Sequence, residues 1–271
     1  MNSKCIFIIG APRSGTSILY DSLSAHPGFS YITDKHNSEH WEELLKYRHE
    51  DLKYLIKLNY NQKLVAPKFI NPDHPNEGTA IWLRYLPHFE YMTENDVTPE
   101  MEQFFKQTIG KIQGSKVFIN KNVHHSYRVR LLDRLFPDCK FIHLLRDRRA
   151  IAYSEFARGR DPRRALGQLY QPDKSYMYNL GLFWKEIVSR AREARQYGGN
   201  RYCEVRYESL VADPVAILRE LIDFCEIEQS AEFEGRIPKI EDMNTKWQEH
   251  LKDRDIKDLQ EAIGSIDLAG S

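Results

Sequence analysis

The N-terminal segment constrains the fold more than any other part of the chain. Residues 5–9 are consecutive apolar side chains, mostly β-branched, as in a strand that is buried on both faces of a parallel sheet. A glycine-rich turn at residues 10–17 follows at once. Leu19 and Leu23 then recur at helical spacing before the chain reaches Pro27. The order strand, glycine loop, helix predicts the start of an α/β fold.

Further apolar runs alternate with helical patterns along the rest of the chain. Strands are expected at residues 117–119, 140–145 and 202–207. Helices are expected within residues 34–63 and near residues 98–112, 126–135, 149–157, 176–191, 214–225 and 255–264. Loops are expected at residues 71–78 and 158–175. The alternation predicts one P-loop-like, three-layer α/β domain over residues 1–271, with a central parallel sheet flanked by helices and a helical insertion at residues 34–115.

Composition and charge exclude several classes of protein. The 271 residues carry 39 basic and 39 acidic side chains, so net charge gives no attraction to nucleic acid or to an acidic membrane. No apolar run approaches the roughly 18 residues of a membrane helix, and no signal pattern begins the chain, which predicts a cytoplasmic protein. The four cysteines lack CxxC spacing, so we expect buried thiols and no metal site. No pattern indicates an oligomeric state.

The glycine loop resembles a phosphate-binding loop with one key replacement. Gly10, Gly15, Thr16 and Ser17 follow the spacing at which backbone N–H groups and a helix N-terminus surround a phosphate. The ATP-binding form of this loop has a lysine where this chain has Thr16. Because that lysine normally reaches the β- and γ-phosphates, its replacement favours a ligand with a single 5′-phosphate. Arg13, inside the loop, is expected to reach the far side of that phosphate. A glycine turn without a ligand is the alternative.

A second anion site is predicted where the strand at residues 140–145 ends. Arg146 follows that strand, Ser154 lies in the next predicted helix, and Arg158 lies about one helical turn further on. An arginine fork beside a hydroxyl makes a good phosphate clamp. The alternative is a structural ion pair between Arg146 and either Asp147 or Glu155.

In parallel sheets flanked by helices, ligands bind beyond the carboxyl ends of the strands. Gly10, Asn120, Arg146 and Tyr207 each follow one of the four predicted strands. If those strands are neighbours, the four residues meet in one crevice. Two phosphate sites without groups for Mg²⁺ indicate 3′-phosphoadenosine 5′-phosphosulfate (PAPS) as the ligand.

The motifs resemble those of the PAPS-dependent sulfotransferases. Four segments carry the likeness in the family's order: residues 10–17, residues 136–150 with Ser154, residues 205–214 and residues 244–247. The tyrosylprotein sulfotransferases and the bacterial sulfotransferases similar to them are closest in these motifs. The resemblance implies a P-loop-like fold, transfer of a sulfuryl group from PAPS to an acceptor hydroxyl, release of 3′,5′-bisphosphoadenosine (PAP), and no metal.

The resemblance also implies roles for individual residues. Arg13 and Lys121 match the arginine and the lysine that stabilise negative charge on the leaving 5′-phosphate. Contacts with the 5′-phosphate are implied for Arg13, Ser14, Gly15, Thr16 and Ser17. Contacts with the 3′-phosphate or the rest of the nucleotide are implied for Arg146, Ser154, Arg158, Tyr207 and Lys246.

The general base that takes the proton of the acceptor hydroxyl has more than one candidate. The family's catalytic glutamate follows a His-Pro pair, and counting from the same pair here leads to Asp34. The alternatives are His36, Glu39 and Glu77. Glu77 is of interest because it stands alone in a proline-rich loop.

The acceptor is expected to be chosen by residues 34–115 and by the 158–175 loop, where the resemblance is weakest. A glycan, a lipid-linked sugar or a small alcohol is expected. Two other functions remain open. One is a P-loop kinase, which needs the lysine that Thr16 replaces. The other is a catalytically silent protein of the same fold, which would bind nucleotide without turnover.

Overall fold

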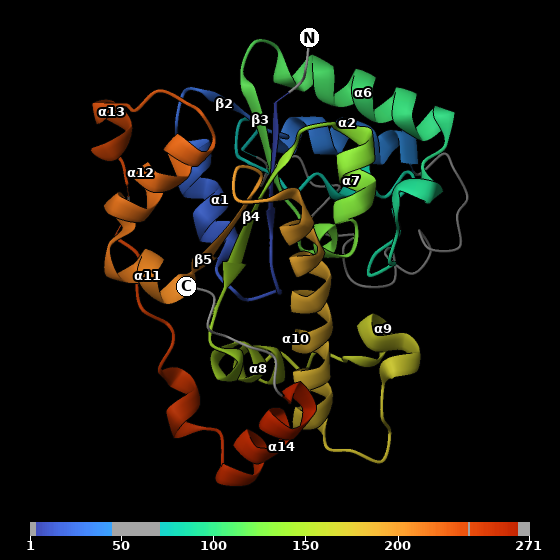
Figure 1. Cartoon of the computed structure of the whole chain (residues 1–271), viewed down its shortest axis with the longest axis vertical. Coiled ribbons are helices and arrows are strands. Elements are labelled where there is room, and N and C mark those ends of the chain that lie inside the picture. The colour runs from blue at the N-terminus through green and yellow to red at the C-terminus, as the bar shows by residue number, and fades with distance from the viewer. Residues whose placement is uncertain (1–3, 45–70, 238, 265–271) are drawn as a thin grey trace.

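The chain folds around a five-stranded parallel sheet with the strand order β2-β3-β1-β4-β5 (Figure 1). This computed structural model describes residues 4–44, 71–237 and 239–264. The strands are β1 (Cys5–Ile9), β2 (Phe29–Ser30), β3 (Val117–Lys121), β4 (Lys140–Leu145) and β5 (Tyr202–Arg206). The predicted central parallel sheet is confirmed.

Helices cover both faces of the sheet. The described α-helices are α1 (Thr16–Ser24), α2 (Asp34–Leu44), α5 (Thr79–Trp82), α6 (Pro99–Gln113), α7 (Val129–Leu135), α8 (Arg148–Phe156), α9 (Arg163–Leu166), α10 (Tyr176–Arg192), α11 (Tyr207–Ala212), α12 (Pro214–Phe224), α13 (Ala231–Glu234) and α14 (Asp253–Ile263). The described 3₁₀ helices are η3 (Glu94–Asp96), η4 (Val123–Tyr127), η5 (Gly167–Leu169), η6 (Glu193–Tyr197) and η7 (Lys246–Glu249).

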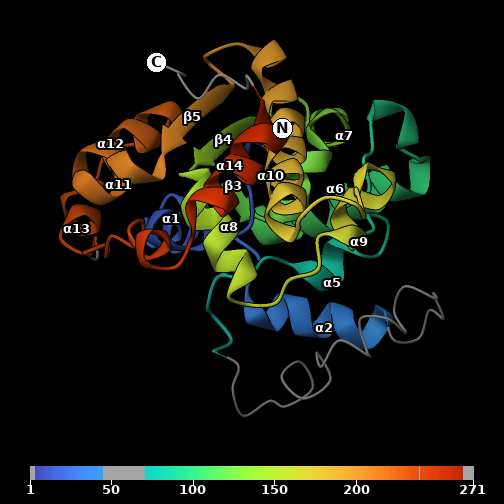
Figure 2. The same cartoon turned by 90° about the horizontal axis from the view of Figure 1, so that it is seen from below.

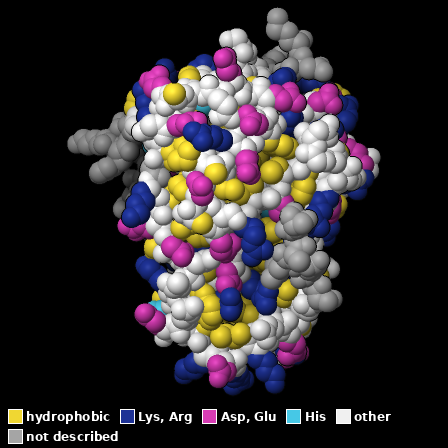
Figure 3. Space-filling model, turned by 60° about the vertical axis from the view of Figure 1, so that its left-hand side comes forward, with side chains coloured by type: hydrophobic (Ala, Val, Ile, Leu, Met, Phe, Trp, Pro, Cys, Tyr) yellow, Lys and Arg dark blue, Asp and Glu magenta, His cyan; other side chains and the backbone are white. Residues whose placement is uncertain are grey.

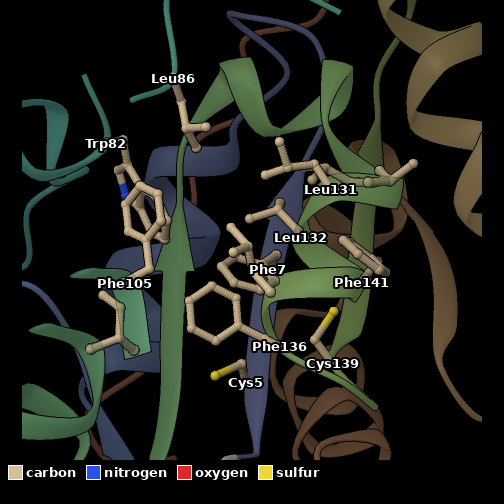
Figure 4. Packing of buried hydrophobic residues seen from close by; sticks show 14 of the residues in the cluster. Cys5, Phe7, Trp82, Leu86, Phe105, Leu131, Leu132, Phe136, Cys139 and Phe141 are labelled. Carbon is tan, nitrogen blue, oxygen red and sulfur yellow. The ribbon is translucent and has the colours of Figure 1, made fainter. Parts of the chain in front are cut away.

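Alternate side chains of β1 enter two different cores. Phe7 lies at the centre of the first core, which includes Trp82 of α5 and Phe105 of α6 (Figure 4). Ile6 and Ile8 enter the second core, with side chains of α1, α11 and α12. A strand buried on both faces must be apolar at every position, which is why β1 was recognisable as a continuous apolar run. Trp82 and Phe105 stack at 4.9 Å between ring centroids, so part of the predicted insertion at residues 34–115 belongs to the main core.

The start of α6 shows how local sequence fixes an element. The hydroxyl of Thr98 accepts a hydrogen bond from the N–H of Met101 at 3.2 Å, and Pro99 occupies the first helical position. Pro suits that position because its missing N–H has no partner there in any helix. The predicted helix start at this threonine is confirmed.

The structure differs from the predicted elements in the 158–175 stretch, which was expected to be a loop. It contains α9 and η5, because buried Leu166 anchors this turn in the core of α8 and α10 side chains. The helix expected near residues 149–157 ends at Phe156, so Arg158 lies beyond it.

Three other boundaries also differ. The helix expected from residue 126 begins at Val129, because Asn122 caps a preceding 3₁₀ turn. Tyr207 begins α11 rather than ending a strand. β2 has only two residues, too few to give a sequence pattern. The helical pattern expected at residues 45–63 lies outside the described residues.

The strand order reverses at β1, since β2 and β3 lie on one side of it and β4 and β5 on the other. In open α/β sheets, ligands bind beyond the carboxyl ends of the strands at such a reversal. Figure 2 looks at the molecule from below the view of Figure 1, with α8 between α1 and α9 in this view. The fold therefore brings the ends of β3, β1 and β4 to one edge of the sheet, called here the carboxyl edge.

Candidate active site

The loop between β1 and α1 requires its two glycines. Gly10 and Gly15 both have positive φ, of 149° and 95°. A Cβ at Gly10 would lie 2.6 Å from the carbonyl oxygen of Leu144, and one at Gly15 would lie 2.6 Å from the ring of Tyr207. Arg13 also has positive φ, of 67°, which costs free energy for a side chain of its type. The loop is thus a specialised turn rather than an ordinary connection.

Several polar groups of this loop fit an anionic ligand. Ser14 is fully buried and its Oγ has no hydrogen-bond partner in the structure. No side chain caps the N-terminus of α1, whose first turn contains Thr16 and Ser17 and no acidic residue. Free N–H groups at a helix N-terminus and the positive end of the helix dipole together favour a phosphate. The residues present therefore fit the 5′-phosphate group that the sequence predicts.

Lys121 ends β3 beside this loop and is almost completely buried. Its Nζ donates a hydrogen bond to Oγ of Ser17 at 3.1 Å. It also forms an ion pair with the carboxylate of Glu77, which comes from the proline-rich loop before α5. The structure brings together Ser17, Lys121 and Glu77, which are far apart in the sequence.

The other predicted candidates for the general base all lie on α2. Asp34 begins α2, and its Oδ1 accepts a hydrogen bond from the side chain of Asn76 at 2.6 Å. His36 Nδ1 contacts the hydroxyl of Thr33 at 3.1 Å, and burial lowers the pKa of this histidine. Glu39 is exposed. Asp34 therefore binds Asn76, the residue before Glu77, whereas Glu77 itself binds Lys121.

Arginines meet on the other side of the loop. Nε of Arg13 donates a hydrogen bond to Oγ of Ser154 on α8 at 3.0 Å. The pKa of Arg13 is lowered, first by burial and then by the positive charge of Arg158, with Arg146 contributing as well. Nearby Glu155 is buried, and burial raises the pKa of its carboxyl. Both candidate phosphate sites therefore share one strongly positive neighbourhood in which Arg13 is the link.

Arg146 is held by neutral groups of the chain, not by a carboxylate as the alternative ion pair would require. Its guanidinium donates to the carbonyl oxygens of Arg13 at 2.8 Å and Met243 at 2.6 Å, and to Oδ1 of Asn244 at 2.9 Å. It also lies over the ring of Tyr207, 4.3 Å from the ring centroid. Asp147 binds Arg149 instead.

The remaining predicted nucleotide contacts lie around this arginine. The ring of Tyr207 packs on Gly15, and its hydroxyl donates to the carbonyl oxygen of Glu241 at 3.0 Å. Arg158 is exposed beyond the end of α8. Lys246 is exposed at the start of η7, two residues after Asn244. The segment after residue 240 thus reaches back across the carboxyl edge.

Sequence reasoning missed one residue of this neighbourhood, and one contact made by a residue of a recognised motif. Asp21 lies on α1, and its pKa is raised by burial and by Glu77, while Lys121 lowers it. Its position four residues after Ser17 on one helix face was the signal that could have found it. Asn244 stands in the motif at residues 244–247, but its contact with Arg146 had no comparable signal because 98 residues separate the two.

The face of the molecule drawn in Figure 3 does not share this concentration of charge. Figure 3 shows acidic and basic side chains interspersed over one face of the molecule. Among the described residues, no group of three or more His, Cys, Asp or Glu side chains is placed to hold a metal ion. In the same part of the chain, no helix is both long and apolar enough to cross a membrane.

Comparisons with known proteins bear on the family and the fold. The omega-hydroxy-beta-dihydromenaquinone-9 sulfotransferase Stf3 of Mycobacterium bovis is 27% identical over 87% of this chain, and the chain spans 65% of the length of that relative. Sulfotransferase STF9 from Mycobacterium avium has the same fold, with a TM-score of 0.57, 18% identity, and coverage of 97% of this chain and 75% of that one.

A second solved structure aligns with this chain over almost the full length of both proteins. The sulfotransferase domain of the Synechococcus PCC 7002 olefin synthase has a TM-score of 0.55 and 18% identity, over 98% of this chain and 97% of that one. These likenesses show the P-loop-like fold. A family model matches residues 5–231, which include the phosphate loop, Lys121 and Arg146. The chain belongs to the sulfotransferase family.

Proposed function

We propose that this protein transfers a sulfuryl group from PAPS to the hydroxyl of a lipid-like alcohol. The observation that carries the proposal is the carboxyl edge itself, where a phosphate loop without the ATP-type lysine lies between buried Lys121 and Arg146. A kinase would need a lysine at the position of Thr16, and membership of the sulfotransferase family speaks against that alternative.

The donor nucleotide would bind across this edge. The loop residues Ser14, Gly15, Thr16 and Ser17 would hold the 5′-phosphate through N–H groups and hydroxyls. Arg146, Ser154 and Arg158 would hold the 3′-phosphate, and Tyr207 and Lys246 would line the nucleotide. The neutral oxygens that now bind Arg146 support this assignment, because a phosphate is a stronger partner for a guanidinium than a carbonyl oxygen.

Two cations would stabilise the leaving group. As the bond between sulfur and the bridging oxygen breaks, negative charge develops on the 5′-phosphate of PAP. Arg13 lies within the phosphate loop, and Lys121 contacts its last hydroxyl, Ser17. Each would act as a positive charge opposite the negative charge that develops, without transferring a proton.

Glu77 is the general base that the geometry supports best. It is the carboxylate that contacts Lys121, whereas Asp34 is bound by Asn76. The base would take the proton of the acceptor hydroxyl as its oxygen attacks sulfur, and PAP would leave on the opposite side. We therefore prefer Glu77, one of the alternatives, over Asp34, the position obtained by counting from the family's motif.

A lipid-like acceptor is supported by the side chains around this edge. Phe156 and Leu169, at the ends of α8 and η5, are about half exposed. The name of the Mycobacterium bovis relative describes a hydroxylated menaquinone derivative as its acceptor. These observations favour an apolar alcohol over the glycan or lipid-linked sugar that the sequence left open.

Calorimetric titration and turnover test the proposal together. We expect PAP to bind without metal, more tightly than ATP with Mg²⁺, and sulfur-labelled PAPS to sulfate a long-chain ω-hydroxy prenyl compound faster than a free sugar. Tight binding of ATP with Mg²⁺ and none of PAP would overturn the donor assignment. Binding of PAP without turnover of any hydroxyl acceptor would favour the catalytically silent protein. Preference for the sugar would overturn only the acceptor.

A further inference from the structure

A buried asparagine adjoins both members of the Lys121–Glu77 pair. Asn120 precedes Lys121 on β3 and is completely inaccessible to solvent. Its Oδ1 lies 3.0 Å from Nε1 of Trp82 and 3.1 Å from Nε2 of His125. Its Nδ2 lies 3.5 Å and 3.4 Å from the carbonyl oxygens of Asn76 and Glu77. One side-chain amide thus joins the core to two successive peptide groups of the loop that carries Glu77.

The chemistry of the partners fixes which way this amide points. Trp82 Nε1 is a donor only, so the atom of Asn120 facing it must be the oxygen. The two loop carbonyl oxygens are acceptors only, so the atom facing them must be the nitrogen. His125 is fully buried, and burial lowers its pKa well below 6.5, so its ring is neutral and carries its proton on Nε2. Each of these contacts is consistent with the others.

Two further donors bind the same pair of carbonyl oxygens. Tyr20 of α1 donates its hydroxyl to the oxygen of Asn76 at 3.2 Å. The side chain of Asn122 donates to the oxygen of Glu77 at 3.5 Å. The loop is therefore tied to α1 and to both sides of Lys121 on β3. A shift of β3 and a shift of the Glu77 backbone cannot occur independently.

We propose that Asn120 is a positioning residue that holds Glu77 in register with Lys121. The proposal rests on the proposed function for the role of Glu77 as the base, but the contacts themselves do not. Asn120 touches neither donor nor acceptor in this assignment. It acts through the loop backbone, and a displacement of about 1 Å at a reacting group can cost roughly 10²-fold in rate.

The variant Asn120→Asp tests this role. A carboxylate of the same size keeps the one oxygen that faces Trp82 and His125, but its second oxygen repels the carbonyl oxygens of Asn76 and Glu77. We expect kcat to fall by about 10²-fold, while the Kd for PAP changes by less than about threefold. In the Glu77→Gln background, the same substitution should have no further effect on kcat, because two residues that act through one step are not additive. An equal fall in both backgrounds would overturn the proposal.

Asn179→Asp is the matched control. Asn179 is also fully buried, and its amide binds the carbonyl oxygens of Gln171 and Ser175 in the same way, at 2.8 Å and 3.0 Å. It lies outside the proposed catalytic groups, so this variant should lose stability without the specific fall in kcat. If Asn120→Asp does not fold, Trp82→Phe removes one anchor of the same amide and should give a smaller fall that also disappears with Glu77→Gln.

Hydrogen exchange measured by mass spectrometry separates this proposal from the proposed function. Asn120→Asp should speed exchange in the peptide covering residues 74–80, and Asn179→Asp should do so only near residues 171–175. Unchanged exchange at residues 74–80 would show that Asn120 does not hold the loop, whatever the activity. Faster exchange there in a protein that sulfates nothing would contradict the proposed function and leave the positioning role in place.

Discussion

The two ends of β4 carry two cations in opposite situations. Lys140, at its first residue, binds the carboxylate of Glu226 at 2.8 Å, and Lys4 binds the same carboxylate at 2.8 Å. Arg146, just after its last residue, binds two carbonyl oxygens and one amide oxygen. At the first end each lysine contacts a carboxylate directly, whereas at the second end the guanidinium binds neutral oxygens and nearby carboxylates such as Glu208 act on it only from a distance. The difference indicates which end of the sheet is built for an anionic ligand.

The largest expected effect is on catalysis at the carboxyl edge. Lys121→Ala removes a cation from the leaving group and should lower kcat by about 10²–10³-fold. The matched substitution Lys140→Ala, at the amino end of β4, should leave kcat unchanged. Single-turnover transfer from labelled PAPS measures both. A similar fall in kcat in both variants would show that the two ends of the sheet do not differ in their role in catalysis.

The next effect is on nucleotide affinity. Arg146→Ala should weaken PAP binding by about 10- to 100-fold, as expected for loss of charge-assisted hydrogen bonds. Binding of AMP, which lacks the 3′-phosphate, should change much less. Calorimetry on the variant with both nucleotides is the measurement, and Lys4→Ala is the control. Equal weakening for the two nucleotides would place Arg146 elsewhere on the ligand.

A smaller effect is expected for the backbone of the phosphate loop. Gly15→Ala would place a Cβ against Tyr207 at a positive φ, and should lower the free energy of unfolding by about 1–3 kcal/mol. Gly110→Ala, within α6 and with nothing close to the added Cβ, should instead be stabilising by up to about 1 kcal/mol. Urea denaturation compares them. A neutral Gly15→Ala would mean that the loop is not held in this conformation.

The smallest effect concerns Glu226, at the edge of the sheet opposite the carboxyl edge, and depends on pH. Hydrogen bonds from Lys140 and Lys4 lower the pKa of Glu226 from 4.5 to about 2. Because the folded-state pKa is depressed, this stabilisation is present above pH 4.5 and is lost as the pH falls toward 2. Glu226 is largely exposed, so Glu226→Gln should cost less than about 1 kcal/mol at neutral pH. The difference from the unmodified chain should vanish in acid, and a difference that persists there would have another origin.

What the sequence could predict follows from the range of each interaction. The conformations of β1, the glycine loop and the start of α6 depend on residues close together in the chain, so the sequence pattern predicts them. The pairing of Lys121 with Glu77 joins residues 44 apart, and no local pattern marks it. Motif counting leads to Asp34 because it measures distance along the chain, and it cannot show that the loop returns Glu77 to β3 through Asn120, so the choice between the two as base stays a prediction. Likewise, the neutral partners of Arg146 come from the phosphate loop and from residues 243–244, which only the folded sheet brings near.

Tyr207 also has a meaning for how such a chain can change over generations. Its ring fills the space that a side chain at position 15 would need, and its face supports Arg146. Its hydroxyl fastens the backbone at Glu241. A descendant that lost the tyrosine would gain room at position 15 but would loosen an arginine and a C-terminal segment in the same step. Positions 15, 146 and 207 are therefore expected to be inherited as one unit, with paired substitutions more frequent than single ones, whereas position 241 contributes only its backbone carbonyl.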